Sequence, residues 1–572
     1  MALRPSTTLQ RVPLSSPPES SLPTLADPEP NSLRAASPTV TRLLAAIVTD
    51  PSFESTTASA LVDELVDFAA HCRLDYAASL VAESASVCPP SGDTDAPDIP
   101  TPRSYAEAIE GRYSSQWQTA MDAEMASWKS TCTYVDDVPP PGANIVDGMW
   151  IYRVKRPPGS PPVFKAHYVA RGFSQRQGVD YFHTFSPTPK MTTLRVLLHV
   201  AAQRDYDLHS LDFSSAFLLG SLHEEIWLRR PPGFTGSFPA GTQWSLRWPV
   251  YGLRQAPREW HNTLRTTLAA LGFAPVAFSP HRHYSAVVLH PRVRRRLGLC
   301  YCWSGPREVG AAEGAQTWVL QRFNFTYSSP QATPLSTRHS LSALPSDESV
   351  EPSGTYPELV GCLTYLMTCT RPDLAYPLSI LARYVTPGRH RPQHMDAAKK
   401  VLRYLCSASG MGLVLGGRAR VVLTGHADTS WVDDLATQRS SQGYTFSLGS
   451  GSVSWWSTCS SFVLSSSCEA EIYAGAMAAQ ELRWHTYLLT DLGEAPRSPP
   501  VLYVDNKAML ALCQEHRLEH RTKHIALRYF LARELQQRGQ LRLAYVATRA
   551  NIADIFTKAL QPCDHQRFCT ML

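Results

Sequence analysis

The fold of this 572-residue chain is decided by a stretch near its C-terminus, which begins Val421-Val-Leu-Thr-Gly-His-Ala-Asp428 and continues through Val501-Leu-Tyr-Val-Asp505 to Asn551-Ile-Ala-Asp554. Apolar, β-branched runs alternate there with helical patterns. Expected strands occupy 421–424, 444–448, 452–456, 501–504 and 541–546, and expected helices occupy 469–489, 507–515, 525–538 and 551–560. Three strands followed by alternating helices and strands predict a mixed α/β sheet covered by helices.

Four carboxylates stand at the ends of these expected elements. They are Asp428 after the first strand, Glu471 opening the long helix, Asp505 ending the fourth strand and Asp554 in the last helix. Acids that converge on one sheet edge repel one another unless cations neutralise them. Such a set suits two Mg²⁺ (or Mn²⁺) ions about 4 Å apart, as in phosphodiester hydrolysis. Any one of these acids alone is better explained as a cap or a solvated charge, so the prediction depends on the ordered set.

Upstream of this stretch, regular structure is expected to begin at Ser104. Ser104-Tyr-Ala-Glu107 is typical of a capping box at a helix start. Trp117, Met121, Met125 and Trp128 then recur every three or four residues, which predicts a helix with one buried face rather than a cofactor box. Residues 1–40 hold eight Pro and seven Ser, so 1–103 is expected to be mostly disordered.

Composition excludes several classes of protein. With 44% hydrophobic and 18% charged residues, the chain can bury substantial cores and is not wholly disordered. It has no apolar run of the ~18 residues that a membrane span needs, and no secretory signal pattern. Thirteen scattered cysteines without a C-x-x-C pair make structural zinc and a disulfide framework poor explanations, which favours an intracellular protein. The net charge of +5 permits a polyanionic partner without establishing one.

Ordered motifs carry a family resemblance. In the C-terminal stretch they are Ala427-Asp-Thr-Ser-Trp431, Leu464-Ser-Ser-Ser-Cys-Glu-Ala-Glu471, Leu502-Tyr-Val-Asp-Asn506, Arg521-Thr-Lys-His-Ile525 and Ala553-Asp-Ile-Phe-Thr-Lys-Ala-Leu560. These look like the ribonuclease H domain of copia-type retrotransposon polyproteins. The upstream motifs are Lys165-Ala-His-Tyr-Val-Ala-Arg-Gly-Phe-Ser-Gln175, Leu211-Asp-Phe-Ser-Ser-Ala-Phe-Leu-Leu-Gly220, Pro231-Pro-Gly-Phe234 and Tyr251-Gly-Leu-Arg-Gln-Ala-Pro257. These resemble the fingers and palm of the copia-type reverse transcriptase.

The resemblance implies a role for each matching residue. Asp428, Glu471, Asp505 and Asp554 match the metal ligands of the nuclease. In the polymerase, Asp212 matches the first metal-binding Asp of the palm, and Phe217 matches the aromatic gate against a ribose 2′-hydroxyl. Gln255, Lys165 and Arg171 match positions that contact the incoming nucleotide and its phosphates. The implied partners are an RNA/DNA hybrid, with an RNA template and a DNA primer in the family, and no membrane. The implied location is a cytoplasmic particle or the nucleus.

The resemblance also implies an α/β and α+β multidomain architecture. It divides the chain into the N-terminal segment 1–103, reverse-transcriptase fingers and partial palm at 104–280, a disrupted junction at 281–330, a connection segment at 331–419, and a ribonuclease H-like domain at 420–572. Arg371-Pro-Asp-Leu-Ala-Tyr376 and Ala398-Lys-Lys-Val-Leu-Arg-Tyr404 match the connection segment.

One expected polymerase motif is missing. Two catalytic metals need ligands from both sides, and the family supplies the second pair in a Tyr-x-Asp-Asp motif after the Tyr251 motif. Leu297-Gly-Leu-Cys-Tyr-Cys-Trp303 begins like the approaching strand, but Ser-Gly-Pro follows it, and no Asp occurs from Pro275 to Phe325. Tyr134-Val-Asp-Asp137 lies ahead of the fingers and is not expected to replace the motif, and Trp431-Val-Asp-Asp434 is expected to be a loop.

Three functions remain open at this point. The preferred hypothesis is a polyprotein fragment with a lost RNA-directed DNA polymerase and a retained, metal-dependent nuclease for RNA/DNA hybrids. A catalytically silent element remnant or nucleic-acid-binding protein is the alternative, and an active polymerase is the third. The oligomeric state and the role of 1–103 do not follow from the sequence.

Overall fold

The structure is a computed structural model of the chain. It describes residues 99–155, 161–186, 190–211, 216–234, 241–270, 273–275, 288–291, 296–300, 312–337, 341, 355–386, 389–417, 420–514 and 531–572. The expectation of disorder for 1–103 falls almost entirely outside these residues. Among the described residues, no helix is both long enough and apolar enough to cross a bilayer.

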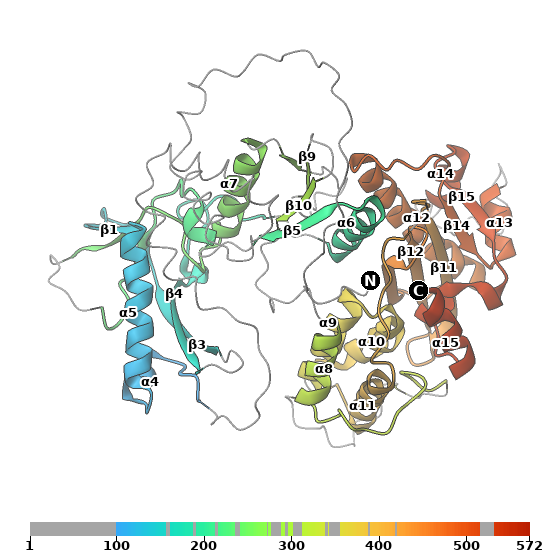
Figure 1. The fold of residues 1–572 in the computed structure, drawn as a ribbon, viewed down its shortest axis with the longest axis horizontal. Coiled ribbons are helices and arrows are strands. Elements are labelled where there is room, and N and C mark those ends of the chain that lie inside the picture. Colours follow the sequence, from blue (N-terminus) through green and yellow to red (C-terminus); the bar gives the residue numbers. More distant parts are fainter. Residues whose placement is uncertain are drawn as a thin grey trace, which may run out of the picture.

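The chain begins with a helical pair packed on a β-hairpin, on the left of Figure 1. Ser104 caps α4 (Tyr105–Glu110) by accepting a hydrogen bond from the Glu107 backbone N–H at 3.2 Å, as the capping box predicts. Helix α5 (Ser114–Ser130) buries the four residues of the predicted stripe. Its Trp117 packs against an aromatic side chain of each hairpin strand, β3 (Gly148–Lys155) and β4 (Val163–Ala170). The aromatic stripe is therefore core, as predicted.

The Tyr134-Val-Asp-Asp137 segment is strand β1 (Tyr134–Asp137) at the edge of a small sheet with the order β1-β7-β6-β2. The other strands are β2 (Ile145–Val146), β6 (Trp227–Leu228) and β7 (Gln243–Leu246). Tyr134 stacks on Trp244 with ring centroids 3.9 Å apart, and Asp136 pairs with Arg230 at 2.8 Å. The contacts of this segment are those of a structural edge strand.

A second four-stranded sheet has the order β5-β10-β9-β8 and follows the chain through β5 (Asp207–Leu211), β8 (Phe273–Pro275), β9 (Val288–Pro291) and β10 (Arg296–Cys300). Strand β10 runs parallel to β5 and antiparallel to β9. Helix α7 (Ala256–Ala270) lies between β7 and β8 in the sequence. The expectation of a disrupted junction over 281–330 is therefore wrong for the described residues of that range, because β9 and β10 extend the sheet of β5.

The C-terminal sheet has five strands in the order β13-β12-β11-β14-β15. The strands are β11 (Thr424–Asp434), β12 (Arg439–Ser447), β13 (Ser452–Cys459), β14 (Val501–Val504) and β15 (Arg542–Tyr545). Its helices are α12 (Ser467–Asp491), α13 (Lys507–Gln514), α14 (Leu531–Gln537), η8 (Thr548–Ala550), η9 (Ile552–Phe556) and α15 (Pro562–Met571). The predicted mixed α/β sheet is confirmed. Two local predictions are wrong: residues 431–434 continue strand β11 instead of forming a loop, and η9 is a short 3-10 turn instead of a helix over 551–560.

A helical cluster precedes this sheet in the chain. It contains α8 (Ala312–Arg322), α9 (Thr355–Cys369), η4 (Pro372–Leu374), α10 (Ala375–Leu381) and α11 (Pro392–Ser407). Helix α8 shares a core with α9, α10 and α11, so residues 312–322 belong to the connection segment rather than to a junction.

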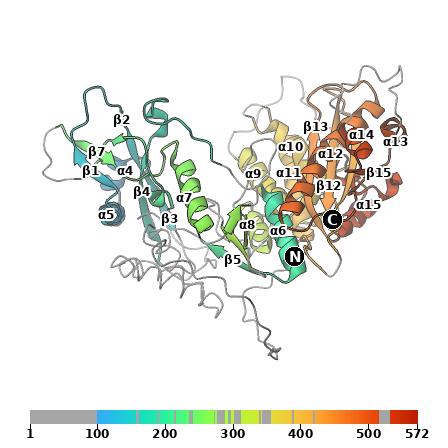
Figure 2. The ribbon, with the colours of Figure 1, turned by 90° about the horizontal axis from the view of Figure 1, so that it is seen from above.

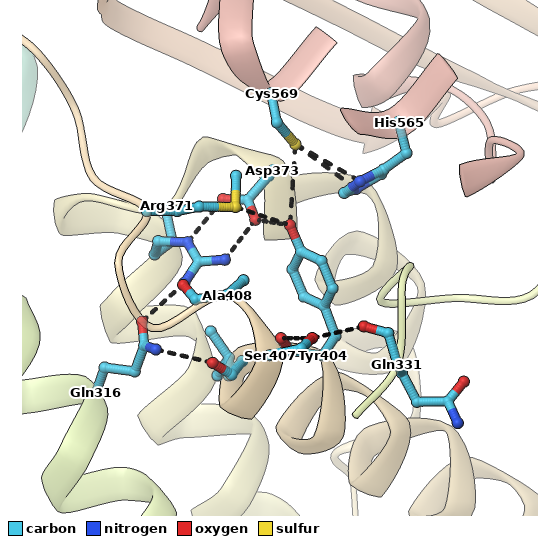
Figure 3. Close-up of polar contacts among 11 residues, drawn as sticks. Gln316, Gln331, Arg371, Asp373, Tyr404, Ser407, Ala408, His565 and Cys569 are labelled. Atoms are coloured by element: carbon cyan, nitrogen blue, oxygen red, sulfur yellow. Dashed lines mark hydrogen bonds and ion pairs between the residues drawn. The ribbon is translucent and has the colours of Figure 1, made fainter. Parts of the chain in front are cut away.

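A buried polar network joins this cluster to the C-terminal helix α15 (Figure 3). The Arg371 guanidinium donates to both carboxylate oxygens of Asp373, at 3.0 and 2.7 Å, and to Gln316 Oε1 at 2.7 Å. The Tyr404 hydroxyl donates to Asp373 Oδ2 at 2.7 Å and lies 3.8 Å from the Cys569 thiol of α15. Breaking one partner of a buried ion pair costs about 3–5 kcal/mol, so the connection segment and the C-terminal helix fold as one unit.

Helix α6 (Met191–Arg204) leaves its sequence neighbours and packs against the C-terminal sheet, where Figures 1 and 2 both place it. Val196, Leu197 and Val200 are buried in the same core as β13 and α12. Arg195 stacks over Trp455 of β13, with the guanidinium carbon 3.8 Å from the ring centroid, and donates to the Val453 carbonyl at 2.7 Å. A helix that the sequence assigned to 104–280 is thus part of the core of the C-terminal domain.

Candidate metal centre

Three acids meet where strands β11 and β14 lie side by side. The parallel register pairs Thr424 with Val501 and His426 with Tyr503. Continuing that register along both chains places Asp428 beside Asp505, because both residues are two positions beyond the last paired residues. Asp428 lies inside β11 rather than after it, since the strand is longer than predicted. Sheet register therefore brings together two carboxylates that are far apart in the sequence.

The third acid comes from helix α12, and its first turn separates two glutamates. Ser466 caps the helix by accepting from the Glu469 backbone N–H at 3.1 Å, and Glu469 Oε2 accepts from the Ser465 N–H at 2.8 Å. Glu469 is thus engaged in capping. Glu471, two residues on, is 7% exposed and turned into the protein. Carboxylate oxygens of Asp428, Glu471 and Asp505 lie within 4.8 Å of one another. This geometry supports the choice of Glu471 over Glu469.

Burial gives this group unusual acid–base properties. Asp428 is 2% exposed, and its desolvation, opposed by the nearby Lys558 ammonium, raises its pKa to about 7. Desolvation and the carboxylates of Asp428 and Asp505 raise the pKa of Glu471 well above its usual range. A bound divalent cation would favour the ionised forms and remove the repulsion. Oxygen ligands of this kind are those that Mg²⁺ and Mn²⁺ accept, so the residues fit the expected metal.

The fourth predicted ligand, Asp554, lies at the same place but in a different setting. It is 6% exposed on η9, and its burial raises its pKa. Among the described residues, the group of acids within 4.8 Å includes Asp428, Glu471 and Asp505 but not Asp554. Its Oδ1 atom instead pairs with Lys558 Nζ at 2.9 Å, and the same ammonium lies 3.7 Å from Asp428 Oδ2.

Three residues that the sequence analysis did not single out hold η9 against β11. Asn551, which is fully buried, donates its amide to the Ala427 carbonyl at 3.1 Å. The Thr557 hydroxyl donates to Asp428 Oδ2. Lys558 pairs with both acids as described above. All three lie in or beside the Ala553–Leu560 motif, and their only signal was that motif, since side-chain contacts across 120 residues leave no local pattern.

The polymerase-like positions are more dispersed. Lys165 and Arg171 are exposed, on β4 and just after it. Phe217 is half-buried on η3 (Ala216–Leu219), edge-on to Tyr251 with ring centroids 4.9 Å apart. Asp212 lies outside the described residues. The structure does not bring these four residues into one described constellation, and their roles stay predictions.

Gln255 is fully buried and its side-chain amide is already engaged within the protein. Its Oε1 accepts from Gln175 Nε2 at 3.0 Å, and its Nε2 donates to the Asp180 carbonyl at 2.8 Å. In this conformation Gln255 joins the segment after β4 to the start of α7. Contact with a nucleotide stays a prediction that would need these hydrogen bonds to rearrange.

Comparisons with known proteins agree with the motifs. The model of the family "Reverse transcriptase (RNA-dependent DNA polymerase)" matches residues 131–281. The retrovirus-related Pol polyprotein from transposon RE2 of Arabidopsis thaliana is 33% identical over 503 residues, which is 81% of this chain and 34% of that protein. The chain is therefore a homologue of copia-type retrotransposon Pol polyproteins, and it spans about a third of the length of the curated relatives it matches.

Two solved structures show the range of the structural likeness. The ribonuclease H1 of the archaeon Halobacterium salinarum covers 24% of this chain and 93% of its own length, at 15% identity and a TM-score of 0.19. The foamy viral protease-reverse transcriptase in complex with double-stranded DNA covers 91% of this chain and 84% of its own length, at 11% identity and a TM-score of 0.41.

Proposed function

We propose that this chain is a metal-dependent nuclease that cleaves the RNA strand of an RNA/DNA hybrid. The observation that carries the proposal is the group of Asp428, Glu471 and Asp505 oxygens within 4.8 Å of one another. Buried acids in this arrangement need a cation, and a divalent cation held there can activate water and stabilise the leaving oxygen of a phosphodiester.

The chain's own residues supply the rest of the arrangement. Asn551 and Thr557 fix η9 and the Asp428 carboxylate, which holds the acids in place before substrate arrives. Preorganised groups of this kind lower the reorganisation that the reaction requires. The relatives support a nucleic-acid substrate, because they are Pol polyproteins of retrotransposons.

The test is cleavage of an end-labelled RNA/DNA hybrid by the purified full chain with Mg²⁺, and with chelator added. We expect cleavage of the RNA strand with Mg²⁺ and none with chelator. Asp428→Asn is the matched variant, since it removes one charge without changing shape. Equal cleavage by the wild-type chain and Asp428→Asn would show that the site is wrong. A folded wild-type chain that cleaves nothing would favour the silent remnant.

We further propose that the polymerase activity has been lost. Strands β5 and β10 are parallel, with Leu211 paired to Cys300, so both strands end at the same edge of their sheet. Asp212 follows β5, whereas Tyr301-Cys-Trp-Ser304 follows β10 and carries no carboxylate. Two metals cannot be held from both sides by one acid. Nucleotide incorporation on a primed RNA template that Asp212→Asn abolishes would contradict this proposal.

A further inference from the structure

The four acids of the metal centre face two different surroundings. Asp428, Glu471 and Asp505 form a group of oxygens that is close enough to share one cation. Asp554 stands beside this group and already has a cationic partner, the Lys558 ammonium, at 2.9 Å. Lys558 also lies 3.7 Å from Asp428 Oδ2. Asp428 is therefore the acid that both settings have in common.

Local structure holds Lys558 in this position. Its backbone N–H donates to the Asp554 carbonyl at 3.2 Å, so the two residues lie on one turn of the chain and their side chains point the same way. Neighbouring Thr557 is fully buried and bound to Asp428. Lys558 also lines a small cavity with Tyr376 and Pro377 of the connection segment. The side chain is 35% exposed, so the ammonium can leave the acids without unfolding the turn.

The charges suggest what this arrangement does. In sites with two divalent cations, one carboxylate commonly lies between the two ions. Asp428 has that place here, with the three-acid group on one side and the Asp554–Lys558 pair on the other. A positive charge that belongs to the protein thus stands between Asp428 and Asp554, where a second divalent ion would otherwise be attracted.

We propose that Lys558 acts as a built-in cation of the metal centre, so that the free protein holds one divalent ion and admits a second only when the Lys558 side chain moves away. The inference rests on the metal centre of the proposed nuclease. It makes Lys558 a positioning residue that controls the number of ions bound, and it assigns Asp554 to the second ion.

The experiment is a calorimetric titration of Mn²⁺ into the full chain, with Mn²⁺ electron paramagnetic resonance as an independent count of bound ions. We expect one ion per chain for the wild type. Lys558→Met, which keeps the length of the side chain and removes its charge, should bind a second ion about tenfold more tightly or better than the wild type. Lys558→Arg should behave as the wild type, and Lys558→Met combined with Asp554→Asn should return to one ion.

Lys399→Met is the matched control, because Lys399 is a half-exposed lysine on α11 outside the metal centre. It should leave the number and affinity of the bound ions unchanged. Lys558→Gln offers the same loss of charge if Lys558→Met does not fold. Identical stoichiometry and affinity in the wild type and in folded Lys558→Met or Lys558→Gln would overturn the inference, and so would two equally tight ions in the wild type.

The outcomes separate this inference from the proposed function. A second ion gained by Lys558→Met, without cleavage of the hybrid by either protein, supports the role of Lys558 and overturns the nuclease. Cleavage by the wild type together with unchanged ion binding in Lys558→Met does the reverse. A folded wild-type chain that binds no Mn²⁺ overturns both.

Discussion

Two sheets of this protein place parallel strands side by side, and only one of them gathers carboxylates there. In the C-terminal sheet, β11 and β14 bring Asp428 beside Asp505, and α12 adds Glu471. In the other sheet, β5 and β10 share the same parallel relation. The chain after β10 continues with Tyr301-Cys-Trp-Ser304. Parallel pairing provides a common edge, but the side chains that follow each strand decide whether a cation can be held.

The sheets also differ in how they are supported. The C-terminal sheet shares its core with α12 and with α6, and the connection segment packs on it through Ala375, Ile555 and Phe556. Tyr376 donates to the Asp433 carboxylate of β11 at 3.0 Å, and Arg383 pairs with Asp434 at 3.2 Å. Elements outside 420–560 therefore help to hold η9 and its Asp554, so a fragment limited to that range lacks part of its own core.

The largest expected effect comes from removing one acid from each sheet. Asp505→Asn should lower cleavage of the RNA/DNA hybrid by about 10²-fold or more, because the cation and the attacking water lose a ligand. Asp212→Asn is the matched change in the other sheet and should leave the cleavage rate unchanged. Rates on a labelled hybrid under single-turnover conditions measure both. Equal losses in the two variants would break the contrast between the sheets.

An intermediate effect should follow from cutting the contact between α6 and the C-terminal sheet. Arg195 is 6% exposed, and its burial lowers its pKa to about 9. It donates to the carbonyls of Val453, at 2.7 Å, and Thr368, at 2.6 Å. Arg195→Met should leave these buried carbonyls without a donor and lower the free energy of unfolding by about 2 kcal/mol or more.

Arg204→Met provides the control for this prediction on the same helix. Arg204 pairs with Glu494 at 2.6 Å, but its side chain is 52% exposed, so its loss should cost less than about 1 kcal/mol. Urea denaturation of the two variants gives the comparison. If both variants unfold as the wild type does, α6 does not belong to the core of the C-terminal domain.

The smallest expected effect is a pH dependence of stability in the metal-free protein. Burial raises the pKa of Asp428 from 3.8 to about 7, so the folded state keeps a proton that the unfolded state has released between these values. In chelator, stability should therefore fall as the pH rises from about 4 to about 7. Asp428→Asn should weaken this dependence and melt at a higher temperature than the wild type at pH 8. Added Mg²⁺ should narrow the difference, because the cation stabilises the ionised acids. A wild-type Tm that rises over this range relative to the variant would contradict the prediction.

Local sequence patterns by themselves determined most of the secondary structure. The spacing of Trp117, Met121, Met125 and Trp128 predicted the buried face of α5, and Ser104 with Glu107 predicted its neighbour's cap. These signals act within a few residues, since helix and strand periods and caps are local. The order of acids along the chain likewise predicted a metal centre in the C-terminal sheet.

Only the tertiary structure decided how those acids are grouped. Sheet register set Asp428 beside Asp505, while Lys558 separated Asp554 from the group by pairing with it. The burial of Gln255, the parallel pairing of β10 with β5, and the place of α6 in the C-terminal core were equally beyond local signals. Each of these features depends on contacts between residues far apart in the chain, where packing and desolvation rather than sequence spacing determine which groups meet.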